Sequence, residues 1–196
     1  MKALILQGSP HKHGNTAQLS APFADELRKL GFAVEELWIY DQKLHPCMGC
    51  GHCQDRIGEI GCAYEDDFTG LVEAILRADL VVLSTPIYAW FPPGPVKIFL
   101  DRLMYAPIKL YGREKAPSLL RGRAIALLVT GGYPPKDIVV PIEIAITHFA
   151  QRHELRYLGW TGGTDPGKDR VFMNEKKEQR VREFARSLAQ KLEDEA

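Results

Sequence analysis

Five short runs that resemble strands, separated by segments with helical periodicity, are the strongest constraint on how this chain can fold. They lie at residues 3–6, 34–39, 80–83, 124–129 and 155–160. The runs at 3–6 and 80–83 are continuously apolar, which is typical of strands buried on both faces of a parallel sheet, whereas 34–39 has Leu37 and Ile39 among its apolar positions. Strands that alternate with helices imply right-handed crossovers, which place helices on both faces. The pattern therefore predicts an α/β fold with a doubly wound five-stranded parallel sheet in the order 2-1-3-4-5.

The segments between the runs carry apolar residues on one helical face. Leu19, Phe23 and Leu27 recur at helical spacing, and Gly31 closes that segment. Helices with one apolar stripe can cover a sheet, as this fold requires. The other expected helices begin near Asp66, Val96, Pro141 and Asn174. With neither a repeat nor a linker in between, we expect a single domain over residues 1–196.

Charge and hydropathy exclude several classes of partner. Lys and Arg total 25, and so do Asp and Glu, so no positive excess is present to neutralise nucleic acid or an anionic membrane. No apolar run reaches the roughly 20 residues that a membrane span needs, and the run at residues 3–6 is too short for a secretory signal. We therefore expect a cytoplasmic protein that binds neither nucleic acid nor membranes.

In the predicted topology, the loops after the first four strands open at one edge of the sheet, where such folds bind ligands. The first of these loops joins Gly8 to the start of a helix, whose unpaired N–H groups favour an anion. Ser9, Asn15 and Thr16 add polar donors. A Walker-type nucleotide loop is disfavoured because Asn15 stands where its lysine would follow the second glycine. A strand-to-helix turn without a ligand is the alternative interpretation.

Three of these loops resemble the flavodoxin-like NAD(P)H-dependent FMN reductase family. Gly8-Ser9-Pro10 with Gly14-Asn15-Thr16 resembles its phosphate loop, and residues 85–88 and 130–132 resemble its other signatures. The resemblance implies a flavodoxin-like FMN-binding domain in which the first loop binds the phosphate and the other two line the isoalloxazine ring. The implied FMN site comprises Ser9, Pro10, His11, Asn15, Thr16, Pro86, Ile87, Tyr88, Ala89, Trp90, Thr130, Gly131 and Gly132.

All four cysteines lie within sixteen residues. Cys47, Cys50 and Cys53 are spaced by three, and Cys62 follows nine positions later. In a reducing compartment such a group is more typical of metal ligands or redox groups than of disulfides. Thiolates suit iron–sulfur clusters and zinc alike, and His45 or His52 could replace a sulfur at zinc. The residues alone leave a cluster, zinc and free redox-active thiols open.

Within the family, this cysteine pattern resembles the iron–sulfur flavoproteins. The resemblance implies that Cys47, Cys50, Cys53 and Cys62 hold a [4Fe–4S] cluster in a cysteine-rich insertion at about residues 41–66. Because this insertion follows the second strand, the topology places it at the same edge of the sheet as the flavin loops.

Together these features predict an FMN-dependent oxidoreductase. It would take electrons from NAD(P)H, bound transiently as a co-substrate, or from a protein donor, and pass them to a quinone, flavin, metal or oxygen species. No separate catalytic side chain is expected, because hydride transfer between stacked rings needs none. The alternatives are an electron-carrier flavoprotein without a small-molecule substrate and a cluster-free flavin or quinone reductase with free thiols or zinc.

The remaining polar residues are expected to be structural. Lys97, Asp101 and Arg102 are interpreted as helix-surface charges or dimer contacts, and His148 and His153 as ordinary surface histidines. Aromatic and proline-rich stretches at residues 88–95 and 105–121 predict a homodimer or homotetramer whose subunits share the flavin pocket.

Overall fold

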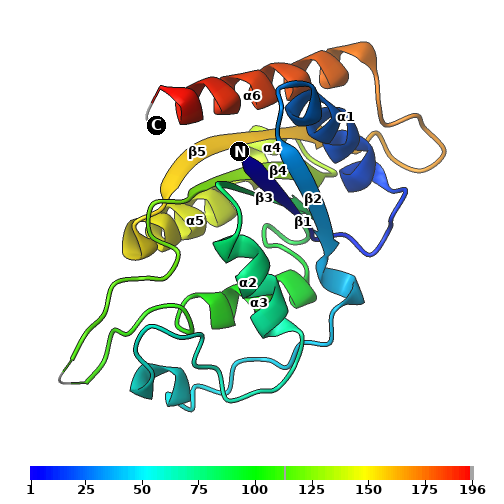
Figure 1. The fold of residues 1–196 in the computed structure, drawn as a ribbon. Coiled ribbons are helices and arrows are strands. Elements are labelled where there is room, and N and C mark those ends of the chain that lie inside the picture. The colour runs from blue at the N-terminus through cyan, green and yellow to red at the C-terminus, as the bar shows by residue number, and fades with distance from the viewer. Residues whose placement is uncertain (113, 195–196) are drawn as a thin grey trace.

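A computed structural model of the chain describes residues 1–112 and 114–194. At its centre is a five-stranded parallel sheet in the order β2-β1-β3-β4-β5, which confirms the predicted order (Figure 1). The strands are β1 (Lys2–Gln7), β2 (Ala33–Trp38), β3 (Leu80–Pro86), β4 (Ala124–Gly131) and β5 (Arg156–Thr164).

Several strand ends differ from the prediction, and β3 and β4 run on to Pro86 and Gly131. β2 stops at Trp38, because Ile39 already begins the short 3-10 helix η1 (Ile39–Asp41), although its side chain is fully buried. β5 continues to Thr164, past the last large apolar residue, Trp160. Its extension consists of small residues that let β5 lie close to β4: a Cβ on Gly162 would come within 2.6 Å of the Val129 carbonyl oxygen.

Helices cover both faces of the sheet (Figure 1). α1 (Asn15–Lys29) and α6 (Glu175–Glu193) pack on one face, against Ala3 and Ile5 of β1. α2 (Phe68–Leu76), α3 (Gly94–Leu103) and α5 (Val140–His153) pack on the other face, against Leu4 and Leu6. The alternation of side chains along β1 therefore divides the apolar interior into two cores. The short elements are α4 (Pro135–Ile138) and the 3-10 helix η2 (His52–Asp55).

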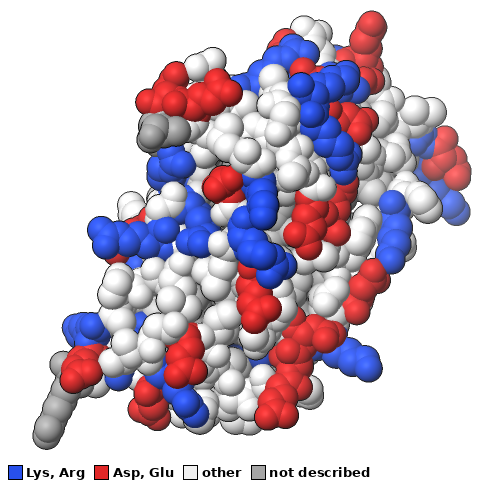
Figure 2. Space-filling view, viewed as in Figure 1, with Lys and Arg blue, Asp and Glu red and all other residues white. Residues whose placement is uncertain are grey.

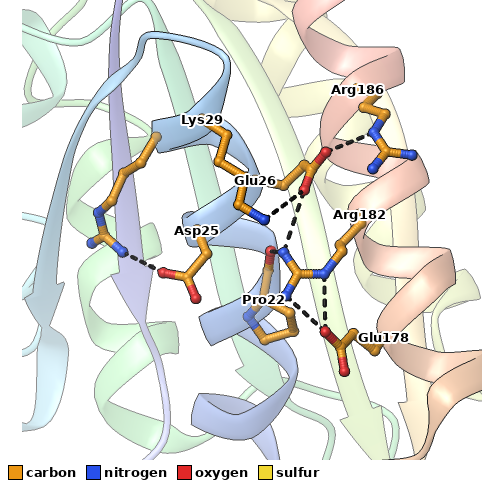
Figure 3. A network of polar contacts seen from close by, with 8 residues as sticks. Pro22, Asp25, Glu26, Lys29, Glu178, Arg182 and Arg186 are labelled. Atoms are coloured by element: carbon orange, nitrogen blue, oxygen red, sulfur yellow. Dashed lines mark hydrogen bonds and ion pairs between the residues drawn. The ribbon is translucent and has the colours of Figure 1, made fainter.

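A polar network joins α1 to α6 (Figure 3). The Glu26 carboxylate is buried and accepts hydrogen bonds from Arg186 at 2.6 Å and from Arg182 at 3.3 Å. Arg182 also donates to Glu178 at 2.7 Å, one turn earlier on α6. The hydrogen bond from Arg186 is the main cause of a lowered pKa of Glu26. The network fixes the two helices side by side over the sheet.

The outer surface is mixed in charge. On the face shown in Figure 2, Lys and Arg side chains are interspersed with Asp and Glu. Among the residues that the structure describes, no helix has both the length and the apolar character to cross a membrane.

Candidate functional site

Hydrogen bonds draw three of the strand-end loops together at one edge of the sheet. The Gly8 N–H donates to the Ser84 carbonyl at 2.7 Å, and the Ile87 N–H donates to the Thr130 carbonyl at 2.8 Å. The Thr16 and Thr130 hydroxyls are 2.8 Å apart and both buried. The loops that follow β1, β3 and β4 therefore form one continuous surface.

The loop after β1 presents an uncapped helix start. α1 begins at Asn15 with Gly14 as its N-cap, and it has neither a side-chain cap nor an acidic residue in its first turn. The first N–H groups of a helix lack internal partners, and with the helix dipole they attract an anion. Ser9 is buried and accepts a hydrogen bond from the His11 N–H at 3.2 Å. The Thr16 hydroxyl shares a hydrogen bond with Thr130 in which either oxygen can donate, and the Thr16 N–H belongs to the uncapped first turn.

Glycines at Gly8 and Gly131 let two of these loops pack closely against the structure behind them. A Cβ on Gly8 would lie 2.7 Å from Val96 Cγ2 and 3.0 Å from Thr85 Oγ1, and a Cβ on Gly131 would collide with Ile138. Pro10 and His11 are exposed beside the helix start, whereas Asn15 is half-buried. The phosphate-loop residues predicted from the sequence thus cluster at the N-terminus of α1.

The loop after β3 is a strained hairpin. Tyr88 and Phe91 exchange backbone hydrogen bonds of 2.8 and 3.0 Å around Ala89 and Trp90, whose φ angles are +48° and +66°. Non-glycine residues in this region cost free energy and persist only where the surroundings hold them. Pro86 and Ile87 are buried behind the turn, whereas Tyr88, Ala89 and Trp90 face solvent.

An aromatic pair that the sequence analysis missed links two of the loops. The Trp90 ring stacks on Tyr133, which follows the exposed Gly132, with centroids 6.4 Å apart and planes 13° apart. The only sequence signal was an aromatic residue directly after Gly131-Gly132. The pair forms an exposed aromatic wall beside the three loops.

The four cysteines line a separate cavity of about 300 Å³. Cys47 and Cys50 are exposed, Cys53 and Cys62 are half-buried, and all four are free thiols. Burial raises the pKa of the Cys53 thiol. The cavity is also lined by Gln54 and Tyr64 of the same segment, by Arg102 of α3, and by Tyr105 and Tyr111.

The cavity lies away from the three loops. Figure 1 shows the segment with η2 beneath α2 and α3, far from the loop that precedes α1. The segment leaves the sheet at the same edge as the first of these loops, whose Lys12 pairs with Asp41 at 2.6 Å, but the cavity that it lines contains no residue of the three loops. η1 carries the chain past the end of β2, and Asp67 then pins the segment against α2 by accepting a hydrogen bond from the Lys43 N–H at 2.7 Å.

The geometry does not present a single-ion site. Within the described residues, no three His, Cys, Asp or Glu side chains form a group that could hold one metal ion. Zinc needs sulfur ligands at about 2.3 Å. His45, a potential zinc ligand, instead hydrogen-bonds Asp66 through Nδ1 at 3.1 Å and stacks on Tyr64. The thiols surround a space rather than converging on a point.

Arg102 is not the surface charge that the sequence suggested. Its side chain is buried, and the guanidinium donates to both carboxylate oxygens of Asp66, at 2.6 and 2.8 Å. Burial alone would raise the pKa of Asp66, but the hydrogen bonds from Arg102 and His45 hold it well below its usual range. Lys97 and Asp101, in contrast, form the exposed pair expected on α3, with an N–O distance of 2.6 Å.

Gln54 was also missed as a functional candidate. Its amide nitrogen donates to the Tyr105 and Ile108 carbonyls, both at 3.0 Å, and its oxygen accepts from the Leu110 N–H at 2.7 Å. A glutamine next to a cysteine gives no sequence signal of such a role. Gln54 attaches the cysteine segment to residues 105–111.

His153 is buried rather than exposed, whereas His148 lies at the surface as expected. The His153 Nδ1 lies 2.7 Å from the Ser118 hydroxyl, and its ring packs on Phe149 with centroids 4.3 Å apart. Burial lowers the pKa of His153 to about 4, against a smaller opposing effect of the Met104 carbonyl. The pair joins residues 105–122 to α5 and has no access to solvent.

Known proteins share both sequence and fold with this chain. An "Iron-sulfur flavoprotein" of Archaeoglobus fulgidus is 35% identical over 132 residues, which cover 67% of this chain and 60% of that protein. Another from the same organism is 36% identical over 104 residues, covering 53% and 46%. A "Putative NAD(P)H-dependent FMN-containing oxidoreductase YwqN" of Bacillus subtilis is 28% identical, covering 52% and 51%. The chain thus spans about half the length of the curated relatives it matches.

The fold also matches solved structures. An NAD(P)H:quinone oxidoreductase from Methanothermobacter marburgensis superposes with a TM-score of 0.70 at 17% identity, covering 96% of this chain and 98% of that one. A flavone reductase superposes with a TM-score of 0.72 at 18% identity, covering 99% and 64%. The family model described as NADPH-dependent FMN reductase matches residues 1–136. The chain belongs to the NADPH-dependent FMN reductase family.

Proposed function

We propose that this protein is an FMN-dependent oxidoreductase that moves electrons from NAD(P)H or a protein donor to a small acceptor: a quinone, flavin, metal or oxygen species. The observation that carries the proposal is the union of three loops at the uncapped N-terminus of α1. The printed names of the relatives, which include flavoproteins and an FMN-containing oxidoreductase, support it.

The residues of the three loops fit FMN in chemistry. The helix start would bind the phosphate through the N–H groups of Asn15 and Thr16, the Ser9 hydroxyl and the Asn15 amide, with Pro10 and His11 beside them. Residues 86–90 and 130–132 would hold the edge of the ring through backbone groups, which tune a flavin's electronics. Bound there, FMN would supply a ring that accepts hydride from nicotinamide. The stacked Trp90 and Tyr133 rings would exclude water from the space beside the flavin ring.

We propose further that Cys47, Cys50, Cys53 and Cys62 hold a [4Fe–4S] cluster, which would supply one-electron storage. Support comes from their arrangement around a single cavity of about 300 Å³, which suits a multinuclear group better than one ion. The name "Iron-sulfur flavoprotein" of several relatives points the same way. Gln54 and Arg102 would act as hydrogen-bond donors near the sulfurs, as outer partners do in many metal sites.

Two alternatives are separated by activity and by metal content. Steady-state oxidation of NADH and of NADPH with quinone, ferric and oxygen acceptors identifies an enzyme, because an electron carrier would turn over only with a protein partner. A cluster-free reductase would turn over without iron, and zinc analysis would reveal a zinc-bound form.

The FMN site has a direct test. Ser9→Ala combined with Asn15→Ala removes donors at the phosphate and should weaken FMN binding at least tenfold, because a hydrogen bond to a charged group contributes about 1.5–3 kcal/mol. Flavin content after purification and titration of released FMN give the measurement. Ser187→Ala on the exposed side of α6 is the matched control. Unchanged flavin affinity in the folded double variant would exclude this site.

We also propose a homodimer or homotetramer that receives a small-molecule or protein redox partner at the flavin loops. Four large rings there are more than half exposed: Tyr88 at 52%, Trp90 at 53%, Phe91 at 57% and Tyr133 at 64%. Clustered exposed aromatic side chains favour an interface between subunits.

A further inference from the structure

We propose that Arg102, held in place by Asp66, is a positioning residue for the four-cysteine cavity, where its charge-assisted hydrogen bond to Cys62 raises the reduction potential of the group bound there. The proposal rests on the cluster proposed above and adds a role for the ion pair between Arg102 of α3 and Asp66, which lies just before α2. It concerns how this chain's own side chains balance the charge of four thiolates.

The Arg102–Asp66 ion pair is buried and held by several hydrogen bonds. Arg102 and Asp66 side chains are 1% and 3% exposed, and their two parallel hydrogen bonds form a bidentate pair. Asp66 is fixed in turn by the N–H groups of His45 at 2.9 Å and Phe68 at 3.2 Å. The guanidinium lies on the Phe68 ring at 4.2 Å from its centroid. It can therefore neither rotate into solvent nor be screened by it.

The guanidinium also reaches the cavity. Arg102 Nη2 donates to Cys62 Sγ at 3.2 Å. Its Nε–H is buried and has no acceptor within residues 1–112 and 114–194. Buried donors almost always have partners, so an unsatisfied one beside a cavity indicates an acceptor that the protein chain does not supply.

No other side chain can take this role. Among the described residues that line the cavity, Arg102 is the one permanent cation, and none is a carboxylate. Gln54 Nε2 lies 3.4 Å from Cys53 Sγ, but its shorter hydrogen bonds go to the Tyr105 and Ile108 carbonyls. Four thiolates in a partly buried cavity need charge compensation. Arg102 is placed to provide it at Cys62.

The sign of the effect follows from the hydrogen bond to Cys62 and from the net charge of the pair. Reduction adds one negative charge to a cluster, and hydrogen bonds to the ligating sulfurs are among the factors that set its potential. Arg102→Gln with Asp66→Asn leaves the net charge unchanged but removes the charged donor at Cys62, and should therefore lower the potential. A tenfold change in the reduction equilibrium, expected for loss of one charge-assisted hydrogen bond, is about 59 mV for a one-electron couple. Asp66→Asn alone leaves the guanidinium uncompensated and should raise the potential.

The experiment uses the purified full chain, reconstituted anaerobically with ferrous iron and sulfide. Iron and sulfide per chain are measured first, and the midpoint potential is then titrated by absorbance and electron paramagnetic resonance. Lys97→Gln with Asp101→Asn is the matched control, because it removes an exposed ion pair from the same helix. We expect a lower potential in the buried-pair variant, a higher one in Asp66→Asn and no change in the control.

The outcomes separate this inference from the proposed function. Wild-type protein that binds no iron overturns the cluster itself, and this inference with it. Wild-type protein with a cluster, combined with an unshifted potential in both buried-site variants, overturns the inference alone. If the double variant fails to fold or to retain iron, the midpoint potentials of Asp66→Asn and Arg102→Lys test the inference in its place. An unshifted potential in Asp66→Asn is then sufficient to reject the role of Arg102.

Discussion

The buried His153–Ser118 pair should make the stability of this protein fall steeply in mild acid. The ring is fully buried, its Nδ1 lies 2.7 Å from the Ser118 hydroxyl, and that hydroxyl accepts from the Leu120 N–H at 3.0 Å. A neutral imidazole has one nitrogen that donates and one that accepts, so the contact with the serine hydroxyl requires no charge on the ring. Protonation would place a charge in the apolar core, and this burial is the main cause of the lowered pKa of His153.

The magnitude follows from the two pKa values. The pKa of His153 is about 4 in the folded protein and about 6.5 in the unfolded chain. As the pH falls below 6.5, the unfolded state takes up the proton first, so stability is lost between about pH 6.5 and pH 4. From pH 8 to pH 5 this group should lower the free energy of unfolding by about 2 kcal/mol, and by about 3 kcal/mol at still lower pH.

Urea unfolding followed by circular dichroism at pH 8 and pH 5 measures this loss. His153→Asn cannot titrate and should show a pH-dependent loss about 2 kcal/mol smaller than that of the wild type. His148→Asn, at an exposed position of the same helix, is the control for the substitution. Because other titrating groups are shared, the comparison isolates His153. Equal losses in wild type and His153→Asn would refute the buried neutral histidine.

Two further predictions concern the sheet and the assembly. Gly162→Ala should destabilise the protein by about 1–3 kcal/mol in thermal unfolding, because the new Cβ would lie 2.6 Å from the Val129 oxygen and 2.7 Å from Val129 Cγ2. The control Gly70→Ala, in open space on α2, should not be destabilised. A Gly162→Ala variant as stable as the wild type would contradict the close packing of β4 and β5. The mass from light scattering should be that of a dimer or tetramer, and Trp90→Ser should weaken the association of subunits. A monomer mass at every protein concentration would exclude an assembly whose subunits share the flavin pocket.

Strand order could be predicted from sequence because it depends on local patterns. The continuous apolar runs at Leu4 and Val82 identify buried strands, and the helical stripes between them leave few topologies. The strand-to-helix turn at Gly14 predicted the start of α1 for the same reason, since a loop and the helix it enters are adjacent in sequence.

The errors arose where a residue's environment is made by distant segments. Arg102 was interpreted as exposed because its partner Asp66 lies 36 residues away, and a charge pattern alone does not reveal a buried pair. His153 could have been found, because it continues the buried stripe of Ile146 and Phe149 on α5. The separate cysteine cavity could not be predicted, because strand order fixes where a loop starts and not where a long loop runs.

The proposed flavin and cluster are tested together by an anaerobic absorption spectrum of the purified protein, with iron, sulfide and zinc measured on the same sample. We predict flavin bands with additional broad visible absorption, and about four iron and four sulfide per chain without stoichiometric zinc. Flavin without iron would contradict the cluster at Cys47, Cys50, Cys53 and Cys62. Protein that neither retains nor rebinds FMN would contradict the site at the three loops.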